Sequence, residues 1–566
     1  MAGESFFTHD PNEETRAARA EDDTQLHRTI PADLIPYLEE ADRVDDEDLA
    51  GDDQQEEVSE RDLALEALAL NSMLLGPDPS IVAELEGDYS QWGEDWEEEL
   101  AERRAEDAHR EALDDAAHTT AVLERVEEIY QQIIARVPEH QVQPTLDRVT
   151  ETLDILGDPQ NSYPSVHITG TNGKTSTTRM IDALLGAFGV RTVRFTSPHL
   201  VDVRERITIE GDSISPDEFV RTWEDIAPYI EMVDRAHAET DGTKLSFFEV
   251  FTVMAFAAFA DHPVDAAVVE VGMGGRWDAT NVIDAGVGVI MPIAIDHEKW
   301  LGSTIREIAE EKAGIIKPGQ IVIVAKQQEE ALRVIEERAA QVDAIVRLEG
   351  RDYEVLDRQL GVGGQMITVR TPAAVYEDVF VPLFGDYQAS NAAAAIAAVE
   401  AFMGGRALDA KVVEAGMLSA TSPGRLQVVR HSPTIIVDAA HNPAGAHTLG
   451  ESISEAFDFE RVVGVYSAMG DKDIEGVLGE VEPYLDSIVI TQMPGPRAKP
   501  AEEIAQIARE VFGSDRVDVQ EDILEAIATA VNLGESGDES APATGVVVFG
   551  SVLLAGEVLR LMDIRP

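Results

Sequence analysis

The chain has 566 residues, no cysteine, and 44 lysines and arginines against 108 aspartates and glutamates, which gives a formal net charge of −64. The lack of cysteine excludes disulfides, thiolate metal sites and a cysteine nucleophile, and it fits a reducing compartment. So negative a chain argues against nucleic acid and anionic membranes as partners, because their phosphates repel it. With no apolar stretch of about 20 residues and no signal pattern at the start, we expect a cytoplasmic protein without a membrane span.

The acidic residues are concentrated at the N-terminus. Residues 1–120 hold 37 aspartates and glutamates, 8 arginines and no lysine. Runs of acid such as 45–48 and 97–99 repel themselves and stay solvated, whereas the apolar stretch 63–75 favours a helix. Two interpretations stay open for an N-terminal extension over residues 1–118: a regulatory or docking arm, or a partly disordered or helical acidic segment that aids solubility.

From residue 119 the pattern alternates between short apolar runs and amphipathic stretches. In chain order it predicts a helix over 123–137, a strand over 165–168, a helix over 175–188, strands over 192–195, 264–271 and 286–295, and a helix over 304–313. After Pro423–Gly424 a second series of strands is expected over 434–437, 462–466, 487–490 and 545–549. Strands that alternate with helices indicate a mostly parallel, doubly wound sheet. We therefore expect an α/β ATP-binding domain over 119–423 and a smaller Rossmann-like α/β domain over 424–566, with a hinge at Pro423–Gly424.

The first chemical motif follows the strand predicted over 165–168. It reads Thr169-Gly170-Thr171-Asn172-Gly173-Lys174-Thr175-Ser176. Glycines between a strand and a helix let backbone N–H groups converge on a phosphate, and a lysine there neutralises the outer phosphates. The spacing departs from the standard Walker pattern, since Ile168 stands where that pattern has its first glycine. The context of strand, loop and helix nevertheless predicts a nucleotide-binding phosphate loop.

Three further clusters lie at the predicted ends of other strands, where such sheets bind ligands. They are 195–200 with Ser197, 269–276 with Glu270, and 295–298 with His297. A carboxylate at the end of a buried strand is costly unless it is paired or holds a metal. Hard oxygen donors beside one imidazole suit Mg²⁺, so Ser197, Glu270 and His297 are the expected metal ligands.

Lys312 follows two acids near the end of a predicted helix, and two interpretations are open for it. One is a surface salt bridge with Glu310 or Glu311, the common fate of a lysine. The other is a buried lysine of lowered pKa that adds CO₂ and becomes a carbamate, an additional Mg²⁺ ligand.

Taken together, these motifs resemble folylpolyglutamate synthase, including its bifunctional dihydrofolate synthase form, within the Mur ligase superfamily. The resemblance rests on the phosphate loop, the Ser197-Pro198-His199-Leu200 segment, Glu270 to Arg276 with Asp278-Ala279-Thr280-Asn281, Asp296-His297 with Trp300-Leu301-Gly302, Glu311 to Gly314, Asn391-Ala392-Ala393, Ser422 to Gln427, Asp438 to Pro443, and Asp471-Lys472-Asp473. It runs from about residue 121 to the end and does not cover residues 1–118.

The resemblance implies a role for particular residues. Thr171, Asn172, Gly173, Lys174 and Thr175 would bind ATP, together with Asn391, Arg425 and Asp438. Ser197, Glu270, His297 and a carbamylated Lys312 would hold two Mg²⁺ ions, with Lys174, Lys312 and His297 serving catalysis. Ser246, Phe247, Phe248 and Glu249, with Trp277, Asp278 and Ala279, would line the pterin site, although Trp277 departs from the family pattern.

The implied reaction is ATP-dependent addition of L-glutamate to a folate or dihydropteroate carboxylate through an acyl phosphate. The implied protein is a monomer with small-molecule substrates. Two alternatives remain at this stage. A Mur-type ligase of peptidoglycan synthesis would need a UDP-binding N-terminal domain, which the acidic residues 1–120 do not resemble. A binding protein with a decayed site would have lost residues such as Lys174 and Glu270, and both are present.

Overall fold

The computed structural model describes residues 96–137, 143–240, 242–495, 497–535 and 544–564. The chain divides into two units, Met1–Glu127 and Glu128–Pro566, and the boundary falls inside helix α5 (Trp96–Ile134). The helix predicted over 123–137 is the last part of α5, which begins earlier than expected. The apolar stretch 63–75 lies outside the described residues, and the domain boundaries at 118 and 423 stay predictions.

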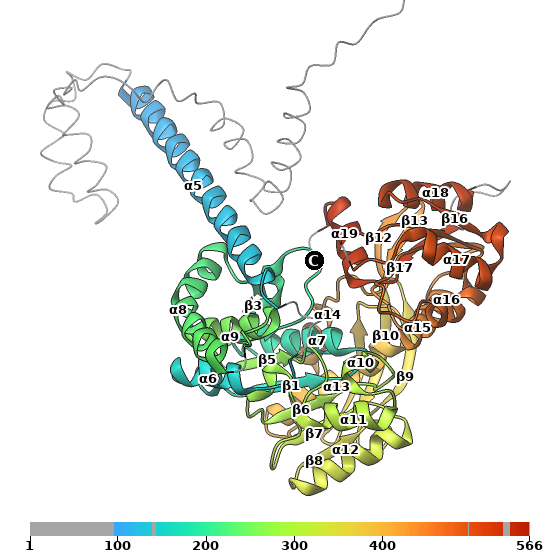
Figure 1. Cartoon of the computed structure of the whole chain (residues 1–566), viewed down its shortest axis with the longest axis horizontal. Helices are drawn as coiled ribbons and strands as arrows, with labels where there is room; N and C mark the ends of the chain where they lie inside the picture. Colours follow the sequence, from blue (N-terminus) through green and yellow to red (C-terminus); the bar gives the residue numbers. More distant parts are fainter. Residues whose placement is uncertain (1–95, 138–142, 241, 496, 536–543, 565–566) are drawn as a thin grey trace, which may run out of the picture. The chain divides into compact units, whose positions relative to one another are not determined.

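The larger unit contains an eight-stranded sheet with the order β4-β3-β2-β5-β1-β6-β7-β8 (Figure 1). The six strands from β2 to β8 in that order are parallel, while β3 and β4 form an antiparallel hairpin at the edge. The strands are β1 (Ser165–Thr169), β2 (Thr192–Phe195), β3 (Ile207–Ile209), β4 (Asp212–Ser213), β5 (Ala266–Glu270), β6 (Val287–Ile290), β7 (Ile321–Val324) and β8 (Ile345–Leu348).

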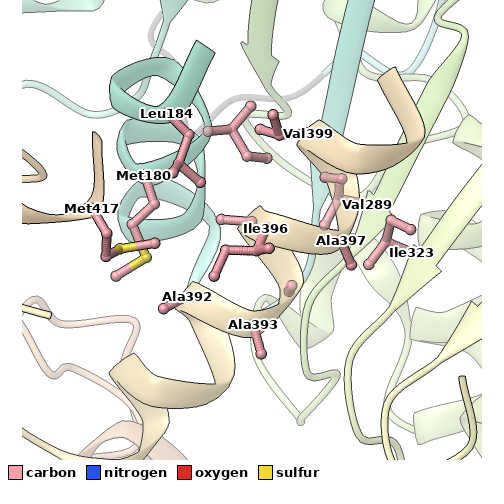
Figure 2. Close-up of a cluster of buried hydrophobic side chains, with 14 of the residues drawn as sticks. Met180, Leu184, Val289, Ile323, Ala392, Ala393, Ile396, Ala397, Val399 and Met417 are labelled. Atoms are coloured by element: carbon pink, nitrogen blue, oxygen red, sulfur yellow. The ribbon is translucent and has the colours of Figure 1, made fainter. Parts of the chain in front are cut away.

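Helices cover both faces of this sheet. Buried residues of α7, α13 and α14 form one core cluster with the sheet, and those of α11 and α12 form another. Figure 2 shows the first cluster, in which Ile396 and Ala392 of α13 face Met180 and Leu184 of α7. The helices before residue 420 are α6 (Asp147–Ile155), α7 (Lys174–Ala187), α8 (Pro216–Thr240), α9 (Phe247–Ala260), α10 (Glu298–Leu301), α11 (Ile305–Lys312), α12 (Glu329–Gln341), α13 (Asp386–Phe402) and α14 (Ala410–Leu418).

A six-stranded sheet follows, with the order β12-β13-β17-β14-β15-β16 and only β12 antiparallel. Helices α15, α16 and α17 join one core cluster with it, and α18 and α19 join another. Its elements are β12 (Gln427–His431), β13 (Thr434–Val437), α15 (Pro443–Ala456), β14 (Arg461–Tyr466), α16 (Ile474–Val481), β15 (Ser487–Ile490), α17 (Ala501–Phe512), β16 (Val517–Val519), α18 (Ile523–Glu535), β17 (Thr544–Phe549) and α19 (Val552–Leu561). The predicted α/β class, with two mostly parallel sheets, is confirmed.

Two features differ from the expectation. The strand predicted over 286–295 stops at Ile290, because Pro292 has no N–H to extend the ladder and the chain leaves the sheet toward Asp296. A three-stranded antiparallel sheet, formed by β9 (Glu354–Gly361), β10 (Gly364–Arg370) and β11 (Val375–Val381), was not predicted. No helix among the described residues is long and apolar enough to cross a membrane.

Candidate active site

The phosphate loop joins β1 to α7, and two of its glycines are required by their surroundings. Gly170 has φ +151°, and a Cβ there would lie 2.6 Å from the Cβ of Met291. Gly173 is left-handed at φ +86°, and a Cβ there would lie 2.8 Å from Oδ1 of Asn391. The loop is anchored to the chain after β6, since Thr171 donates from its N–H to Pro292 O (2.9 Å) and from Oγ1 to Ala294 O (3.0 Å). The backbone of this loop is therefore held close to β6 and α13.

Two lysines converge on the loop from different helices. Lys174 Nζ donates to Gly170 O (3.1 Å) and Thr171 O (3.3 Å), while Lys312 Nζ donates to Gly170 O (2.8 Å). Lys312 is 4% exposed, so the surface salt bridge considered for it is wrong. Its acidic neighbours are paired elsewhere, Glu310 with Arg306 and Glu311 with Arg276.

The surroundings of these two lysines lower the pKa of each ammonium group. Burial lowers the pKa of Lys174, and burial together with the charge of Lys174 lowers the pKa of Lys312 to about 7. Among the described residues, neither ammonium forms a salt bridge with a carboxylate. Positive charge without a directly bonded carboxylate suits a polyanion such as a nucleotide phosphate chain. An amine with a pKa near neutrality also has the uncharged fraction that addition of CO₂ requires.

Glu270 ends β5 directly beside the loop. Thr175 Oγ1 donates to its Oε1 (2.8 Å), and the N–H of Ser197 donates to its Oε2 (3.4 Å). The carboxyl is 1% exposed, and burial raises its pKa, although the charge of Lys174 opposes that shift. The end of β2, the end of β5 and the start of α7 thus meet, as predicted from the parallel strands.

The chain after β6 brings Asp296 and His297 to the same edge. His297 has φ +53° and precedes α10, and its Nε2 lies 3.9 Å from Asp296 Oδ2. Burial lowers the pKa of His297 to about 4, which leaves the imidazole neutral and able to bind a metal. Burial alone would raise the pKa of Asp296, but the hydrogen bond from His441 and the charge of Lys472 hold it well below its ordinary value.

Residues from the second α/β half also reach this edge. Lys472 Nζ donates to Asp296 Oδ1 (2.8 Å), and Asn442 Nδ2 donates to Asp296 Oδ2 (3.2 Å) and to Asn172 Oδ1 (3.1 Å). Sequence reasoning quoted Asp296, Asn442 and Lys472 within motifs but gave them no role. Their presence in those motifs could have marked them as candidate site residues. That they lie close together became visible only in the folded structure.

The other residues expected to contact the nucleotide lie in different surroundings. Asn391 on α13 touches Gly173, and Arg425 lines a small cavity together with Thr175 and Thr196. Asp438 is buried, and both its oxygens accept from backbone N–H groups, of Leu426 and Ala440, at 2.7 Å each. The carboxylate of Asp438 therefore also supports the turn that carries Arg425.

The residues expected at the pterin site form two neighbouring groups. A Cβ at Gly272 would lie 2.4 Å from Phe248 Cζ, so the start of α9 lies against the loop after β5. Ser246 and Glu249 form a capping box at that helix start, and Arg148 Nη2 donates to Glu249 Oε1 (2.9 Å). Their side chains are thus occupied within the fold, while the ring of Phe247 packs at a tilt against that of Phe251, with ring centroids 4.8 Å apart.

The second group follows β5. Trp277 is half-buried, whereas Asp278 and Ala279 are buried. Asp278 Oδ2 accepts from the N–H of Met273 (2.8 Å), and its Oδ1 accepts from Thr280 N (3.0 Å) and Thr280 Oγ1 (2.5 Å). Burial raises the pKa of Asp278 to about 6.

The side chains at this edge include the oxygen and nitrogen donors that could bind Mg²⁺. In the described part of the chain no three His, Asp or Glu side chains cluster as a ready-made metal site. The hydroxyl of Thr175 and the carboxylate of Glu270 are nevertheless hard oxygen donors at 2.8 Å from each other, and Ser197 adjoins them. His297 is neutral, and Lys312 becomes an oxygen donor only as a carbamate. The residues present fit the ion on these terms.

Comparison with known proteins places the chain in a family. Residues 168–399 match the Mur ligase middle domain, and residues 424–552 match the Mur ligase glutamate ligase domain. The chain is 46% identical over 465 residues to a dihydrofolate synthase/folylpolyglutamate synthase of Mycobacterium tuberculosis, an alignment that covers 79% of this chain and 95% of that protein. It is 31% identical to the folylpolyglutamate synthase of Lacticaseibacillus casei, over 73% of this chain and 94% of that protein.

Solved structures agree. A Mycobacterium tuberculosis folylpolyglutamate synthase complexed with ADP and AMPPCP has a TM-score of 0.75 and 45% identity, covering 79% of this chain and all of that one. Escherichia coli FolC in complex with DHPP and ADP has a TM-score of 0.67 and 28% identity, covering 77% of this chain and 97% of that one. The chain therefore belongs to the dihydrofolate synthase/folylpolyglutamate synthase family of ligases, within the Mur ligases.

Proposed function

We propose that the protein is an ATP-dependent ligase that joins L-glutamate to a folate or dihydropteroate carboxylate and releases ADP and phosphate. One observation carries the proposal: the half-buried Lys174 and the buried Lys312 converge on the phosphate loop next to a buried glutamate at the end of β5. The nucleotides present in the relatives' structures support ATP as the phosphoryl donor, and DHPP in the Escherichia coli structure supports a pteroate-like acceptor.

The loop residues Thr171, Asn172, Gly173, Lys174 and Thr175 would hold the phosphates of ATP, with Asn391, Arg425 and Asp438 completing the nucleotide site. Gly173 and Asn391 are in contact, and Thr175 and Arg425 line one cavity, which supports a shared ligand. Arg425 is suited to phosphate because its guanidinium can bind two oxygens at once.

Mg²⁺ would be held at two sites by Thr175, Ser197, Glu270, His297 and a carbamylated Lys312, and would neutralise charge on the phosphates. The addition of CO₂ to the uncharged amine forms an N–C bond at Lys312 Nζ and releases one proton, so that two protons are released when counted from the ammonium form. It converts a cation into an anionic oxygen donor. The lowered pKa of Lys312 and its burial support this modification.

The chemistry needs two displacements. A carboxylate oxygen of the acceptor attacks the γ-phosphorus, and the bond from that phosphorus to the bridging oxygen breaks, so that ADP leaves. The amine of glutamate then attacks the acyl carbon, loses a proton, and expels phosphate. The protein positions the reactants in line and neutralises the charge that moves, which is the role assigned to Lys174.

The acceptor would lie between the start of α9 and the loop after β5, lined by Ser246, Phe247, Phe248 and Glu249 and by Trp277, Asp278 and Ala279. Contact between Phe248 and Gly272 supports a single pocket wall. Movement at Pro423–Gly424 would close the site and exclude water from the acyl phosphate. We further propose a monomeric, cytoplasmic enzyme with an acidic extension over 1–118, an ATP-binding domain over 119–423 and a glutamate ligase domain over 424–566.

The test is ADP release by the purified protein with L-glutamate and, in separate reactions, dihydropteroate, tetrahydrofolate or a UDP-muramoyl acceptor. We expect turnover with one or both pterins that stops when glutamate is omitted. Turnover with the UDP-muramoyl acceptor alone would overturn the folate assignment and favour the Mur-type alternative. Comparison of the two pterins also shows whether both synthase activities are present.

A further inference from the structure

A chain of buried hydrogen bonds lies beneath the carboxylate of Asp278. His167 occupies the middle of β1 and is fully buried, as is Thr280. His167 Nε2 lies 2.9 Å from Thr280 Oγ1, and Thr280 Oγ1 lies 2.5 Å from Asp278 Oδ1. Three side chains from β1 and from the loop after β5 are thereby connected in series.

The direction of the protons in this chain follows from counting donors. The hydroxyl of Thr280 has one hydrogen, which it donates to the carboxylate of Asp278. Nε2 of His167 must then carry a hydrogen and donate it to Thr280. Its Nδ1 is buried without a partner, as an unprotonated nitrogen would be, and burial together with the charge of Lys317 lowers the pKa of His167 to about 3. His167 is therefore neutral, with its hydrogen on Nε2.

This arrangement is a poor choice for stability alone. A buried polar atom without a partner destabilises the folded protein, and the neighbours of His167 along β1 are the apolar Val166 and Ile168. An aliphatic residue in the same place would avoid that cost. The presence of a histidine is explained if the hydroxyl of Thr280 has to accept a hydrogen bond in order to keep its own hydrogen directed at Asp278.

The bonds also leave one acceptor free. Each carboxylate oxygen can accept two hydrogen bonds. Oδ1 of Asp278 accepts two from Thr280, while Oδ2 accepts one from the N–H of Met273. The remaining lone pair on Oδ2 is held in a fixed direction and suits an N–H donor of a heterocyclic substrate.

We propose that His167 and Thr280 are positioning residues that orient the Asp278 carboxylate toward an N–H group of the acceptor substrate. The inference rests on the proposed function, since it takes Asp278 as part of the acceptor site. Neither residue touches the substrate. Their contribution is to acceptor affinity, not to nucleotide binding or phosphoryl transfer.

The first test removes the hydroxyl of Thr280 without changing its shape. Thr280→Val should raise the KM for the pterin substrate about 10-fold, equivalent to about 1.4 kcal/mol, because the Asp278 carboxylate loses the hydroxyl that orients it. The affinity for ADP and the KM for glutamate should stay within about twofold. Thr280→Ser, which keeps the hydroxyl, should raise the pterin KM by less than about threefold. The matched control is Thr222→Val, since Thr222 is buried on α8 and its hydroxyl has no partner; it should change none of these constants.

The second test addresses His167 directly. His167→Gln can still donate to Thr280 and should keep more pterin affinity than His167→Leu, which cannot. Nitrogen NMR of the wild-type protein should show the His167 hydrogen on Nε2, a measurement independent of activity.

Three results would overturn the inference. One is that the wild-type enzyme is active and Thr280→Val has the same KM for the pterin substrate as the wild type. Another is a loss of ADP affinity in Thr280→Val that matches its loss of pterin affinity, as a purely structural role would produce. The third is a hydrogen on Nδ1 of His167. A wild-type protein inactive with every pterin acceptor would instead overturn the proposed function on which the inference rests.

Discussion

The loop after β1 and the start of α9 both bury charged side chains, yet they treat them in opposite ways. At the loop, Lys174 and Lys312 donate to backbone carbonyls and have no carboxylate partner within the described residues. At α9, Glu249 receives the guanidinium of Arg148 and the N–H of Ser246, with both charged side chains almost fully buried. Among the described residues, one region leaves its ammonium groups without a direct carboxylate partner, and the other pairs a buried carboxylate with a buried guanidinium.

This difference distinguishes charged residues that can bind a ligand from charged residues that stabilise the fold. Burial of an unpaired charge is expensive, so a site that keeps one is stabilised when a ligand of opposite charge arrives. A buried carboxylate that is already paired within the protein gains less from the arrival of a ligand. On this view Lys174 and Lys312 serve the chemistry, whereas the carboxylate of Glu249 serves the architecture beneath the acceptor site.

The largest effect is expected at Lys174. Lys174→Ala removes the positive charge nearest the loop carbonyls and should lower ADP formation by at least about 10³-fold, as loss of a charge that stabilises phosphoryl transfer does. The fold should be intact, because the lysine makes only two backbone hydrogen bonds. The measurement is ADP release together with the unfolding midpoint. Lys411→Ala on the exposed surface of α14 is the matched control. A folded Lys174→Ala protein with appreciable turnover would contradict the comparison.

Lys312 gives the next prediction. Lys312→Ala should be inactive, because the carbamate cannot form, and acetate at high Mg²⁺ should restore part of the activity by supplying a carboxylate in its place. The rescue is measured as ADP release against acetate concentration. Chloride at equal ionic strength is the control for salt effects. Full activity of Lys312→Ala without acetate would show that the buried amine has no part in the reaction.

The sequence predicted the carboxyl edge of the sheet well. Parallel strands place their carboxyl ends along one edge of the sheet, so Thr175, Ser197 and Glu270 could be expected at that edge, where the structure connects them by hydrogen bonds. The three-stranded sheet was missed although Gly363, with φ +79°, stands at a turn between two β-rich stretches. Its strands pair locally and antiparallel, a pattern that a search for alternating strands and helices overlooks.

The side-chain environments could not be predicted in the same way. Two acids precede Lys312, and only the fold shows that the lysine turns to Gly170 while Glu311 turns to Arg276. The partner of Glu249 is Arg148, 101 residues earlier in the chain, and the spacing of a capping box gives no hint of it. Such partners depend on tertiary packing, which the local pattern does not encode.

Arg148→Met tests the compensated region. It leaves Glu249 buried without its cation and should destabilise the protein by about 3–5 kcal/mol, the usual cost of breaking a buried pair from one side. The expected signature is a lower unfolding midpoint, with ADP affinity unchanged in protein that remains folded. Arg191→Met, which breaks the exposed pair with Asp265, is the control and should lower the unfolding midpoint far less, because solvent screens that pair. Equal losses from the two variants would mean that burial of the pair does not matter.

The smallest effect concerns His167, which is neutral and forms no ion pair but donates a hydrogen bond to Thr280. Burial lowers the pKa of His167 to about 3, and its ordinary value in an unfolded chain is 6.5. Below pH 6.5 the unfolded chain therefore binds a proton that the native protein does not, so the stabilising contribution is complete above that pH and is lost as the pH falls toward 3. At pH 5.5 the loss amounts to about 1.4 kcal/mol for this one residue. The measurement is the free energy of unfolding of the wild type and of His167→Gln at pH 8 and pH 5.5. Because the other titrating groups are shared, the difference between the two pH dependences isolates His167. Curves that stay parallel would show that His167 has the same pKa in the native and the unfolded protein, and that burial does not suppress its protonation.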